Sequence, residues 1–551
     1  MLTPTTMMTP SSKPKYLDGV TPYHWLVFVL ASLGWLFDCT GQRIFVLARE
    51  PALRELLGSD AGEGDVRYWG GLATFILMVG WATGGILFGI VSDRYGRVKA
   101  MVATLFAFTV FTGLSGLASS AVEFLAYRFP CGLGVGGMFG AATTLIAESV
   151  PPRFRALALG LMQTLSACGN MLASILSFSI TPGTENVLGT WSGWQLLFFV
   201  GVVPVILAIP MILGLREPEP WKLAKIEAAK GAPEKRVGRL ADLFGDARWR
   251  RSTIVGVCLG MSGMVGLWGI AFFSPELVTT ALKERPLGQE ELLRPDRIRA
   301  ELAGSATPVL VSLRDRIDRK AILDSTSVDP LLRELNTLIL GESLYSAKAF
   351  EATTLKRGTQ KLAHLVESGQ GGRDVAFLNR QILEQVFPGA ISELQPTIDN
   401  LRSRGTLLQD VGSLLGMLSF TFLATRSSRR AAFLAAFGSC LVIVPSVFYA
   451  LGSATDILWM LPLMGFGTMS CFAGYAIYFP ELFPTRLRGT GVGFCYNTVR
   501  YLAAPFPFLL GWLSTTMPFR SVAIGMSAIY LVGILALLWA PETKDQPLPE
   551  S

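Results

Sequence analysis

The sequence predicts an all-α membrane protein with twelve transmembrane helices in two six-helix bundles and a helical insertion outside the membrane. Composition is one reason, because 51% of the 551 residues are hydrophobic and only 16% are charged, unlike a soluble chain of this length. Twelve apolar stretches are long enough to cross a hydrocarbon layer of about 30 Å. A loop motif also occurs twice, at a fixed offset of 333 residues.

The candidate spans are apolar runs of roughly 20 residues each, the length that a helix needs to cross the bilayer. They cover residues 25–47, 68–91, 101–118, 122–147, 156–180, 194–215, 253–278, 407–425, 431–451, 457–479, 490–513 and 521–540. Residues 1–23 are polar and rich in Pro and Thr, and they lack a short apolar core followed by a cleavage site. We therefore expect the first span to stay in the membrane and not to be removed as a signal peptide.

The repeated motif reads E-x-x-P-x-R-x-R-small, and it runs from Glu148 to Ala156 and again from Glu481 to Gly489. Residues 132–134 read Gly-Leu-Gly and are matched by Gly-Phe-Gly at residues 465–467, at the same offset. A duplicated six-helix unit is typical of carriers whose two halves rock around a site near the membrane midplane. The sequence therefore predicts a protein that moves a small-molecule substrate across the bilayer by alternating access.

The distribution of basic residues predicts the orientation. With the N-terminus placed inside, the inner loops hold 23 Lys and Arg residues and the short outer loops hold four. Because cytoplasmic loops carry an excess of basic residues, we expect a multi-pass protein of the inner (plasma) membrane with both termini in the cytoplasm. The net charge of +7 is then explained by topology, and nucleic acid is not an expected partner.

The spans divide the chain into two halves, with a long insertion in the second half. We expect an N-terminal six-helix bundle at 1–220, a cytoplasmic linker at 221–250, helix 7 at 251–280, an extracytoplasmic helical insertion at 281–405 and helices 8–12 at 406–551. Apolar residues of the insertion, such as Leu331, Leu335 and Leu338, recur at helical spacing. At this length it can form a small domain, used as a lid or for a partner. The alternative is a poorly ordered insertion without a role.

Few residues are suited to catalysis or metal binding. All seven cysteines fall in predicted spans without metal-ligand spacing, and the chain has only two histidines. The sequence shows no nucleophile–base pair, metal cluster or phosphate-binding loop. We therefore expect no enzymatic activity, no cofactor and no metal, and a monomer in the lipid bilayer.

The loop after the second span is the most specific motif. It reads Gly89-Ile-Val-Ser-Asp93-Arg94-Tyr-Gly96-Arg97-Val-Lys99 and resembles the G-x-x-x-D-R-x-G-R-x-K loop of the major facilitator superfamily. The equivalent loop 332 residues later, at 425–430, keeps its basic residues but lacks the acid and the glycine. The resemblance implies the two-bundle fold, secondary transport and an inner gate of charge pairs formed by Asp93, Arg94, Arg97, Glu148, Arg153, Glu481 and Arg486. The alternative is that these charges only set the topology.

Two branches of the superfamily share features with this chain. Arg155, Gln163 and Gly169 have a spacing that resembles helix 5 of sugar porters, but helix 7 lacks the paired glutamines of hexose carriers. Residues 480–491, Pro-Glu-Leu-Phe-Pro-Thr-Arg-Leu-Arg-Gly-Thr-Gly, are more similar to proton-coupled metabolite symporters, many of which carry organic acids. Neither branch matches throughout.

Two charged residues in predicted spans are the candidates for proton coupling. Asp38 lies in the middle to outer half of the first span, where a carboxylate costs about 2.5–3.5 kcal/mol on insertion scales. Arg43 lies on a different face of that helix, so Arg128, deep in the fourth span, is the better partner candidate. The resemblance adds that an arginine in R-x-x-x-G-x-G is implicated in proton coupling. The alternative for Asp38 is a structural ion pair.

The candidate substrate-binding residues are polar or aromatic side chains in spans. Gln163 and Asn170 lie on a polar stripe of helix 5 that also includes three serines, although small polar residues often serve helix packing. Arg500 is a cation in the second half that can bind an anionic group, or it can snorkel to the interface. The full set is Gln163, Asn170, Trp268, Tyr475, Tyr496, Asn497 and Arg500.

The sequence therefore predicts a carrier that takes up a small polar metabolite together with a proton, with an organic acid favoured by Arg500. A sugar or polyol is the alternative within the same superfamily. A non-transporting nutrient sensor, with the outer insertion as its ligand receptor, is the alternative from another class.

Overall fold

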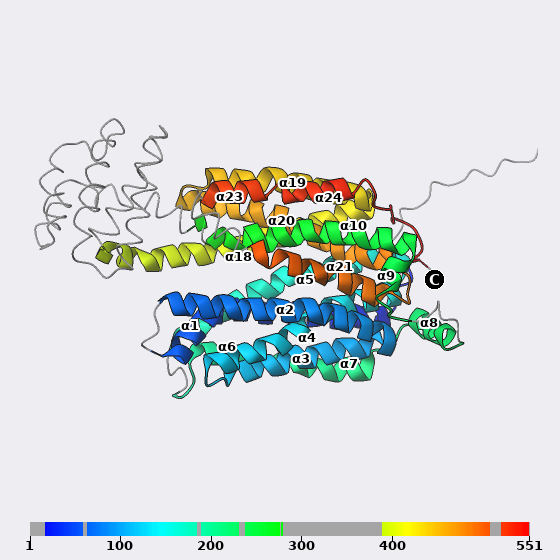
Figure 1. Cartoon of the computed structure of the whole chain (residues 1–551), viewed down its shortest axis with the longest axis horizontal. Helices are drawn as coiled ribbons and strands as arrows, with labels where there is room; N and C mark the ends of the chain where they lie inside the picture. The colour runs from blue at the N-terminus through cyan, green and yellow to red at the C-terminus, as the bar shows by residue number, and fades with distance from the viewer. Residues whose placement is uncertain are drawn as a thin grey trace, which may run out of the picture. The chain divides into compact units, whose positions relative to one another are not determined.

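A computed structural model of the chain describes residues 17–58, 63–184, 189–230, 237–275, 277–278, 388–506 and 519–549. The chain divides into two compact units. One comprises Met1–Phe273, Leu407–Tyr449 and Leu461–Ser551, and the other comprises Ser274–Thr406 and Ala450–Met460. Every regular element among the described residues is helical, and the long helices of the larger unit run along a common direction (Figure 1).

The N-terminal half contains five long helices and a sixth, interrupted one. They are α1 (Pro22–Leu57), α2 (Glu63–Tyr95), α3 (Arg97–Gly116), α4 (Ala121–Ser149) and α5 (Pro152–Ser179), followed by α6 (Gly193–Val200), η1 (Val203–Leu207) and α7 (Ala208–Gly214). Pro204 lies in η1, and a proline removes a helical hydrogen bond, which accounts for the break. The central helix α4 packs against α2 and α3, and α5 packs against α1.

The linker contains α8 (Glu219–Ala229) and α9 (Asp242–Gly245), and the C-terminal half follows. Its helices are α10 (Ala247–Met264), continued by η3 (Val265–Ile270) and η4 (Ala271–Phe273), then α18 (Pro388–Arg426), α19 (Arg429–Ala450), α20 (Ala454–Leu482), α21 (Arg488–Ala503), α23 (Phe519–Met526) and α24 (Ile529–Ala536). The η3 segment is a π-helix, a widened turn that is often found at functional sites.

Ten of the predicted spans correspond to helices that are long and apolar enough to cross a membrane. The last two predicted spans, 490–513 and 521–540, correspond to α21 and to the shorter apolar helix Arg520–Ala536, and residues 507–518 lie outside the described residues. The count of twelve therefore stays a prediction. Helix α18 begins at Pro388, earlier than the predicted span at 407, and the predicted insertion before residue 388 lies outside the described residues.

Helices α2 and α21 belong to opposite halves and cross at very short range. A Cβ atom on Gly89 would lie 2.6 Å from the carbonyl oxygen of Gly489, and one on Gly85 would overlap the side chain of Asn497. Only glycine permits this approach. The crossing brings the polar residues of α21 against the N-terminal half, where the candidate site forms.

Candidate functional site

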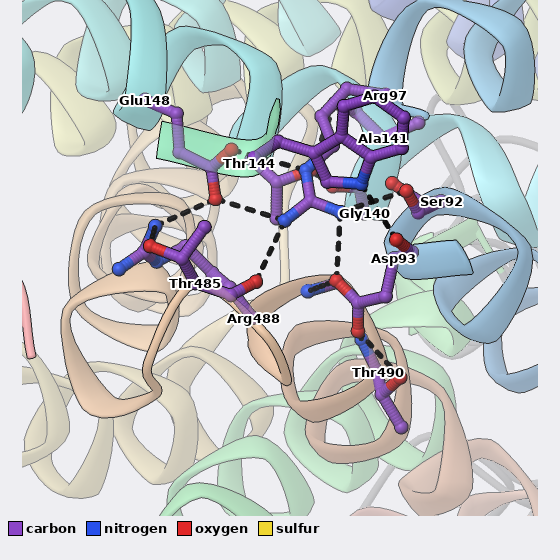
Figure 2. A network of polar contacts seen from close by, with 12 residues as sticks. Ser92, Asp93, Arg97, Gly140, Ala141, Thr144, Glu148, Thr485, Arg488 and Thr490 are labelled. Atoms are coloured by element: carbon purple, nitrogen blue, oxygen red, sulfur yellow. Dashed lines mark hydrogen bonds and ion pairs between the residues drawn. The ribbon is translucent and has the colours of Figure 1, made fainter. Parts of the chain in front are cut away.

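A buried charge cluster around Asp93, Arg97 and Glu148 is shown in Figure 2. It belongs to what we call the inner rim, the loops around residues 93–97, 148–152, 426–429 and 481–488. Arg97, the first residue of α3, binds Glu148 through two bonds, Nε–Oε2 at 3.1 Å and Nη2–Oε1 at 2.9 Å. Its Nη1 donates to Asp93 Oδ1 at 2.8 Å. The side chains of Arg97, Glu148 and Asp93 are 0% exposed, so these pairs are shielded from water.

The cluster continues into the C-terminal half. Arg488 Nη1 lies 2.6 Å from Glu148 Oε1. Asp93 accepts hydrogen bonds from the backbone amides of Gly489 and Thr490 at 2.9 and 2.7 Å, and from the Thr490 hydroxyl at 2.6 Å. These are the first amides of α21, which lack partners within their own helix, so Asp93 of α2 caps a helix of the opposite half. The cluster therefore holds the two halves together at the inner rim.

The C-terminal half repeats part of this arrangement. Arg429 binds Glu481 at 3.1 and 3.0 Å, as Arg97 binds Glu148. Glu217 accepts from the amides of Arg97 and Val98, at 2.6 and 3.1 Å. Glu542 likewise accepts from the amides of Arg429 and Arg430, at 3.0 and 3.3 Å. Asp93 has no acidic counterpart, because Thr425 stands at the equivalent position.

Glu542 lies outside the spans, and the backbone amides that it caps at the start of α19 change the pKa of its carboxyl. Burial raises the pKa of its carboxyl, but hydrogen bonds from the amides of Arg429, Lys544 and Arg430 outweigh burial. The pKa of Glu542 is therefore lowered from its ordinary value, and the carboxylate keeps its charge at the N-terminus of α19.

The structure brings some of the predicted gate residues together but not all of them. Asp93, Arg97 and Glu148 form the buried cluster, and Glu481 forms its counterpart in the C-terminal half. Arg94 is exposed. Arg153 is also exposed, 3.9 Å from Asp18, and Arg486 binds Asp242 at 2.8 Å. Arg153 and Arg486 therefore form ion pairs with acids outside the predicted gate.

The basic partners of Glu148 and Glu481 are Arg97, Arg429 and Arg488. Arg429 and Arg488 were missing from the predicted gate. Arg153 lies in the first turn of α5, on its exposed side, whereas Arg488, at the start of α21, is fully buried. The signal for Arg429 and Arg488 was present in the repeat, because they stand 332 and 333 residues after Arg97 and Arg155. Glu217 and Glu542 lie at the ends of the two halves, and comparison of the halves could have found them too.

A second polar site surrounds Arg500 on α21. Its guanidinium is 1% exposed and lies 4.0 Å from the ring centre of Trp81 and 4.6 Å from that of Tyr496. Its Nη1 donates to the carbonyl of Tyr496 at 2.8 Å and to Asn497 Oδ1 at 2.6 Å. Its Nε has no hydrogen-bond partner, and across the described ranges no carboxylate forms an ion pair with this residue. Among the described residues, Arg500 is thus a buried cation without a counter-ion.

Asp38 of α1 is the acidic group that the charge of Arg500 influences, although the two form no ion pair. Its Oδ2 accepts from Gln42 Nε2 at 2.9 Å, and its Oδ1 has no partner within the described parts of the chain. The side chain is fully buried. A carboxyl group of the N-terminal half therefore lies in the electrostatic field of a cation of the C-terminal half.

Arg128 is not the partner of Asp38. Its guanidinium bonds to Ser115 Oγ and to the carbonyl of Phe111. It also lies 5.1–5.3 Å from the ring centres of Phe45, Phe124 and Phe198. The expected pairing of Asp38 with Arg128 is therefore wrong. The orientation of α4 about its own axis directs the Arg128 side chain towards aromatic residues of the N-terminal half, and the cation that acts on Asp38 is Arg500.

The remaining candidates lie in different surroundings. Trp268, in the π-helix η3, packs edge-on against Trp81 with 5.9 Å between ring centres, and Tyr496 stacks on Phe139 at 3.8 Å. Tyr496 therefore lies beside Arg500, and Trp268 packs on Trp81, the other ring that contacts Arg500. Tyr475 donates its hydroxyl to the carbonyl of Leu259 at 2.7 Å, so that hydroxyl is already used.

The helix 5 stripe faces the C-terminal half. Gln163 is buried, donates to Ser166 at 3.4 Å and has no partner for its Oε1 among the residues the structure describes. Asn170 lies beside Asp410 of α18, and Asp410 lies 3.8 Å from Arg43 of α1. This pair, with side chains 21% and 13% exposed, is a looser contact between the halves than the inner rim.

Comparison with known proteins agrees with this arrangement. The profile described as Major Facilitator Superfamily matches residues 28–283. The chain is 23% identical over 480 residues to the cis,cis-muconate transport protein of Acinetobacter baylyi, which covers 87% of this chain and 86% of that relative. It is 27% identical over 203 residues to the benzoate transport protein of the same organism, covering 36% of this chain and only 40% of that relative.

A solved structure shows the same fold. The proton:xylose symporter XylE, bound to 6-bromo-6-deoxy-D-glucose, superposes with a TM-score of 0.58 at 16% identity, over 96% of this chain and 98% of that chain. At this identity the likeness concerns the fold alone. The profile match covers a little under half of the chain. Together with the transport proteins among the relatives and the shared fold, it shows a resemblance to the membrane transporters of the major facilitator superfamily, which are not enzymes.

Proposed function

We propose that the protein carries a small organic anion across the membrane and that Arg500 binds the carboxylate of this substrate. The observation that carries the proposal is the buried guanidinium of Arg500, which has no counter-ion in the part of the chain that the structure describes. An uncompensated buried charge costs several kcal/mol, and a bound carboxylate would offset that cost. Arginine also presents planar donors that match a carboxylate.

The surroundings of Arg500 favour an organic acid over a sugar. Trp81 and Tyr496 provide aromatic surfaces beside the cation, and Trp268 packs on Trp81. Such surfaces suit the apolar body of an organic acid. Muconate and benzoate, named for two relatives, are carboxylates. The sugar or polyol alternative rests on Gln163, whose buried Oε1 has no partner in the described chain and could accept a bond from a hydroxyl.

Proton coupling through Asp38 follows from the same geometry. An ionised Asp38 and a substrate carboxylate compete for the field of Arg500, which acts on Asp38 from the opposite half. Substrate binding would therefore favour the protonated form of Asp38, and protonation would favour binding, because such coupling is reciprocal. A role of Arg128 in proton coupling stays a prediction. Arg128 would act through its packing within the N-terminal half.

Alternating access requires that the inner rim opens and closes. The contacts of Asp93 and Glu148 across the halves support a carrier state that is closed on its inner side. Release on that side would require these bonds to break. The excess of basic residues in the rim loops supports a cytoplasmic position for this rim and for both termini.

An uptake screen in proteoliposomes tests the proposal. Purified protein would be reconstituted, and the accumulation of labelled benzoate, cis,cis-muconate and xylose would be measured with and without an inward proton gradient. We expect accumulation of at least one carboxylate, driven by the gradient, and no accumulation of xylose. Xylose uptake without carboxylate uptake would favour the sugar alternative, and binding without any uptake would favour the sensor alternative.

A further inference from the structure

A groove lies at the inner end of the C-terminal half, between α10 and α24. It has a volume of about 480 Å³. Arg250 and Arg251 of α10 line one end, next to Trp539, and Ile254, Cys258 and Leu535 belong to its apolar wall. The groove opens at the surface, because Arg250 and Arg251 are exposed and Leu535 and Trp539 are 56% and 58% exposed.

The two ends of the groove match two depths of a membrane. Helix α10 belongs to a candidate span from Ala247 to Ile270, so Arg250 and Arg251 lie near the inner end of that span. Cys258 lies seven residues beyond Arg251, roughly 10 Å further along the helix at 1.5 Å per residue. The arginines are therefore at the level of lipid headgroups, and the apolar wall is at the level of acyl chains.

No described residue neutralises the positive charge at the mouth of the groove. The Arg250 side chain has neither a hydrogen bond nor an ion pair within the described residues, and Arg251 donates only its Nε, to the carbonyl of Trp539 at 3.0 Å. No acidic residue lines the groove. Arg248, which stacks on Trp249 at 4.7 Å, adds a third cation in the same turn.

We propose that this groove binds an anionic diacyl phospholipid of the inner leaflet. Arg250 and Arg251 would bind the phosphate, and an acyl chain would lie along Ile254, Cys258 and Leu535. Basic pockets between transmembrane helices on the cytoplasmic side are suited to anionic headgroups. A free phosphate would satisfy the arginines but would leave the apolar wall unused, so the occupant is a lipid.

The bound lipid would stabilise the contact between α10 and α24. Helix α10 also packs against α21, which carries Arg500, and continues into η3, which carries Trp268. The lipid site is thus connected through α10 to the proposed substrate site, although the lipid proposal does not depend on which substrate is carried.

The test measures lipid binding by the purified full-length protein in detergent. Native mass spectrometry and thermal unfolding would be recorded with added phosphatidylglycerol, phosphatidylcholine or soluble glycerol phosphate. We expect only phosphatidylglycerol to bind and to raise the unfolding temperature. At about 1 kcal/mol per arginine, the R250Q/R251Q double variant should lose roughly 30-fold in affinity. The I254W variant keeps both charges and fills the groove, and it should also weaken binding.

The matched control is R426Q/R430Q, which removes two arginines from the same end of the same half but away from the groove. It should bind phosphatidylglycerol as the wild type does. The proposal would be overturned if R250Q/R251Q and I254W bound phosphatidylglycerol normally, or if the control lost binding equally. Equal stabilisation by glycerol phosphate would show a simple anion site and would also overturn it.

Discussion

At the scale of single residues, the site depends on a cation and a carboxyl group that do not neutralise each other. Arg500 bonds to a backbone carbonyl and to the Asn497 side chain of its own helix, but to no acid in the described chain. Asp38 keeps one oxygen without a partner. If a stable ion pair were their only role, direct contact would be expected, since breaking a buried pair is costly. Because neither group neutralises the other, both stay available for the proposed exchange of a substrate anion and a proton.

The Asp38→Asn variant tests this role of the carboxyl group. It removes the proton-binding group but keeps a side chain of the same size that can still bond to Gln42. We expect exchange of labelled substrate across the membrane to persist, while gradient-driven accumulation is lost. Accumulation at the wild-type level in Asp38→Asn proteoliposomes would show that the coupling proton binds elsewhere.

Which residues lie in spans could be predicted from the sequence, but their partners could not. Arg500, Tyr496 and Asn497 were predicted as site residues from polarity and position, and they do lie together. Trp81 was missed, because a tryptophan in an apolar span usually indicates packing. The pairing of Asp38 with Arg128 was wrong, because hydropathy does not reveal how each helix is rotated.

At the scale of elements, the inner rim shows a duplicated arrangement with one asymmetric addition. Arg97–Glu148 and Arg429–Glu481 have nearly identical geometry. Only the N-terminal half has the additional carboxylate of Asp93, which caps α21. The duplication was visible in the repeated motif. The cap was not, because it joins residues 396 and 397 positions apart and depends on the crossing of α2 and α21.

Asp93→Ala tests the importance of this cap. The variant removes a helix cap worth about 0.5–2 kcal/mol and a partner of the buried Arg97, so we expect destabilisation of about 3 kcal/mol or more. Labelling of an introduced cysteine at the inner rim should also become faster, because the rim would open more often. Thermal unfolding and labelling rates would be measured.

Thr425→Ala is the matched control for Asp93→Ala, since Thr425 occupies the equivalent position in the C-terminal half and bonds only to carbonyls of its own helix. It should change stability by less than about 0.5 kcal/mol. Equal effects of the two variants on rim labelling would contradict the account of Asp93 as a link between the halves.

At the scale of the whole molecule, the contacts between the halves differ along the membrane normal. The inner rim has short, fully buried bonds, whereas Arg43 and Asp410 lie 3.8 Å apart and partly exposed. Ion pairs of the latter kind contribute only about 0–1 kcal/mol. Opening at the level of Arg43 is therefore easier than opening at the inner rim, which is what a carrier closed on its inner side requires.

The central claim is that Arg500 binds the carboxylate of the substrate, and equilibrium binding tests it most directly. Isothermal titration of the carboxylate found by the uptake screen would compare wild type, Arg500→Gln, Arg500→Lys and the exposed control Arg430→Gln. Losing one partner of a buried charge pair costs about 2–5 kcal/mol, so Arg500→Gln should weaken binding by about 30-fold or more. Arg500→Lys should recover part of the affinity, and Arg430→Gln should bind normally. Wild-type affinity in a folded Arg500→Gln protein would contradict the account.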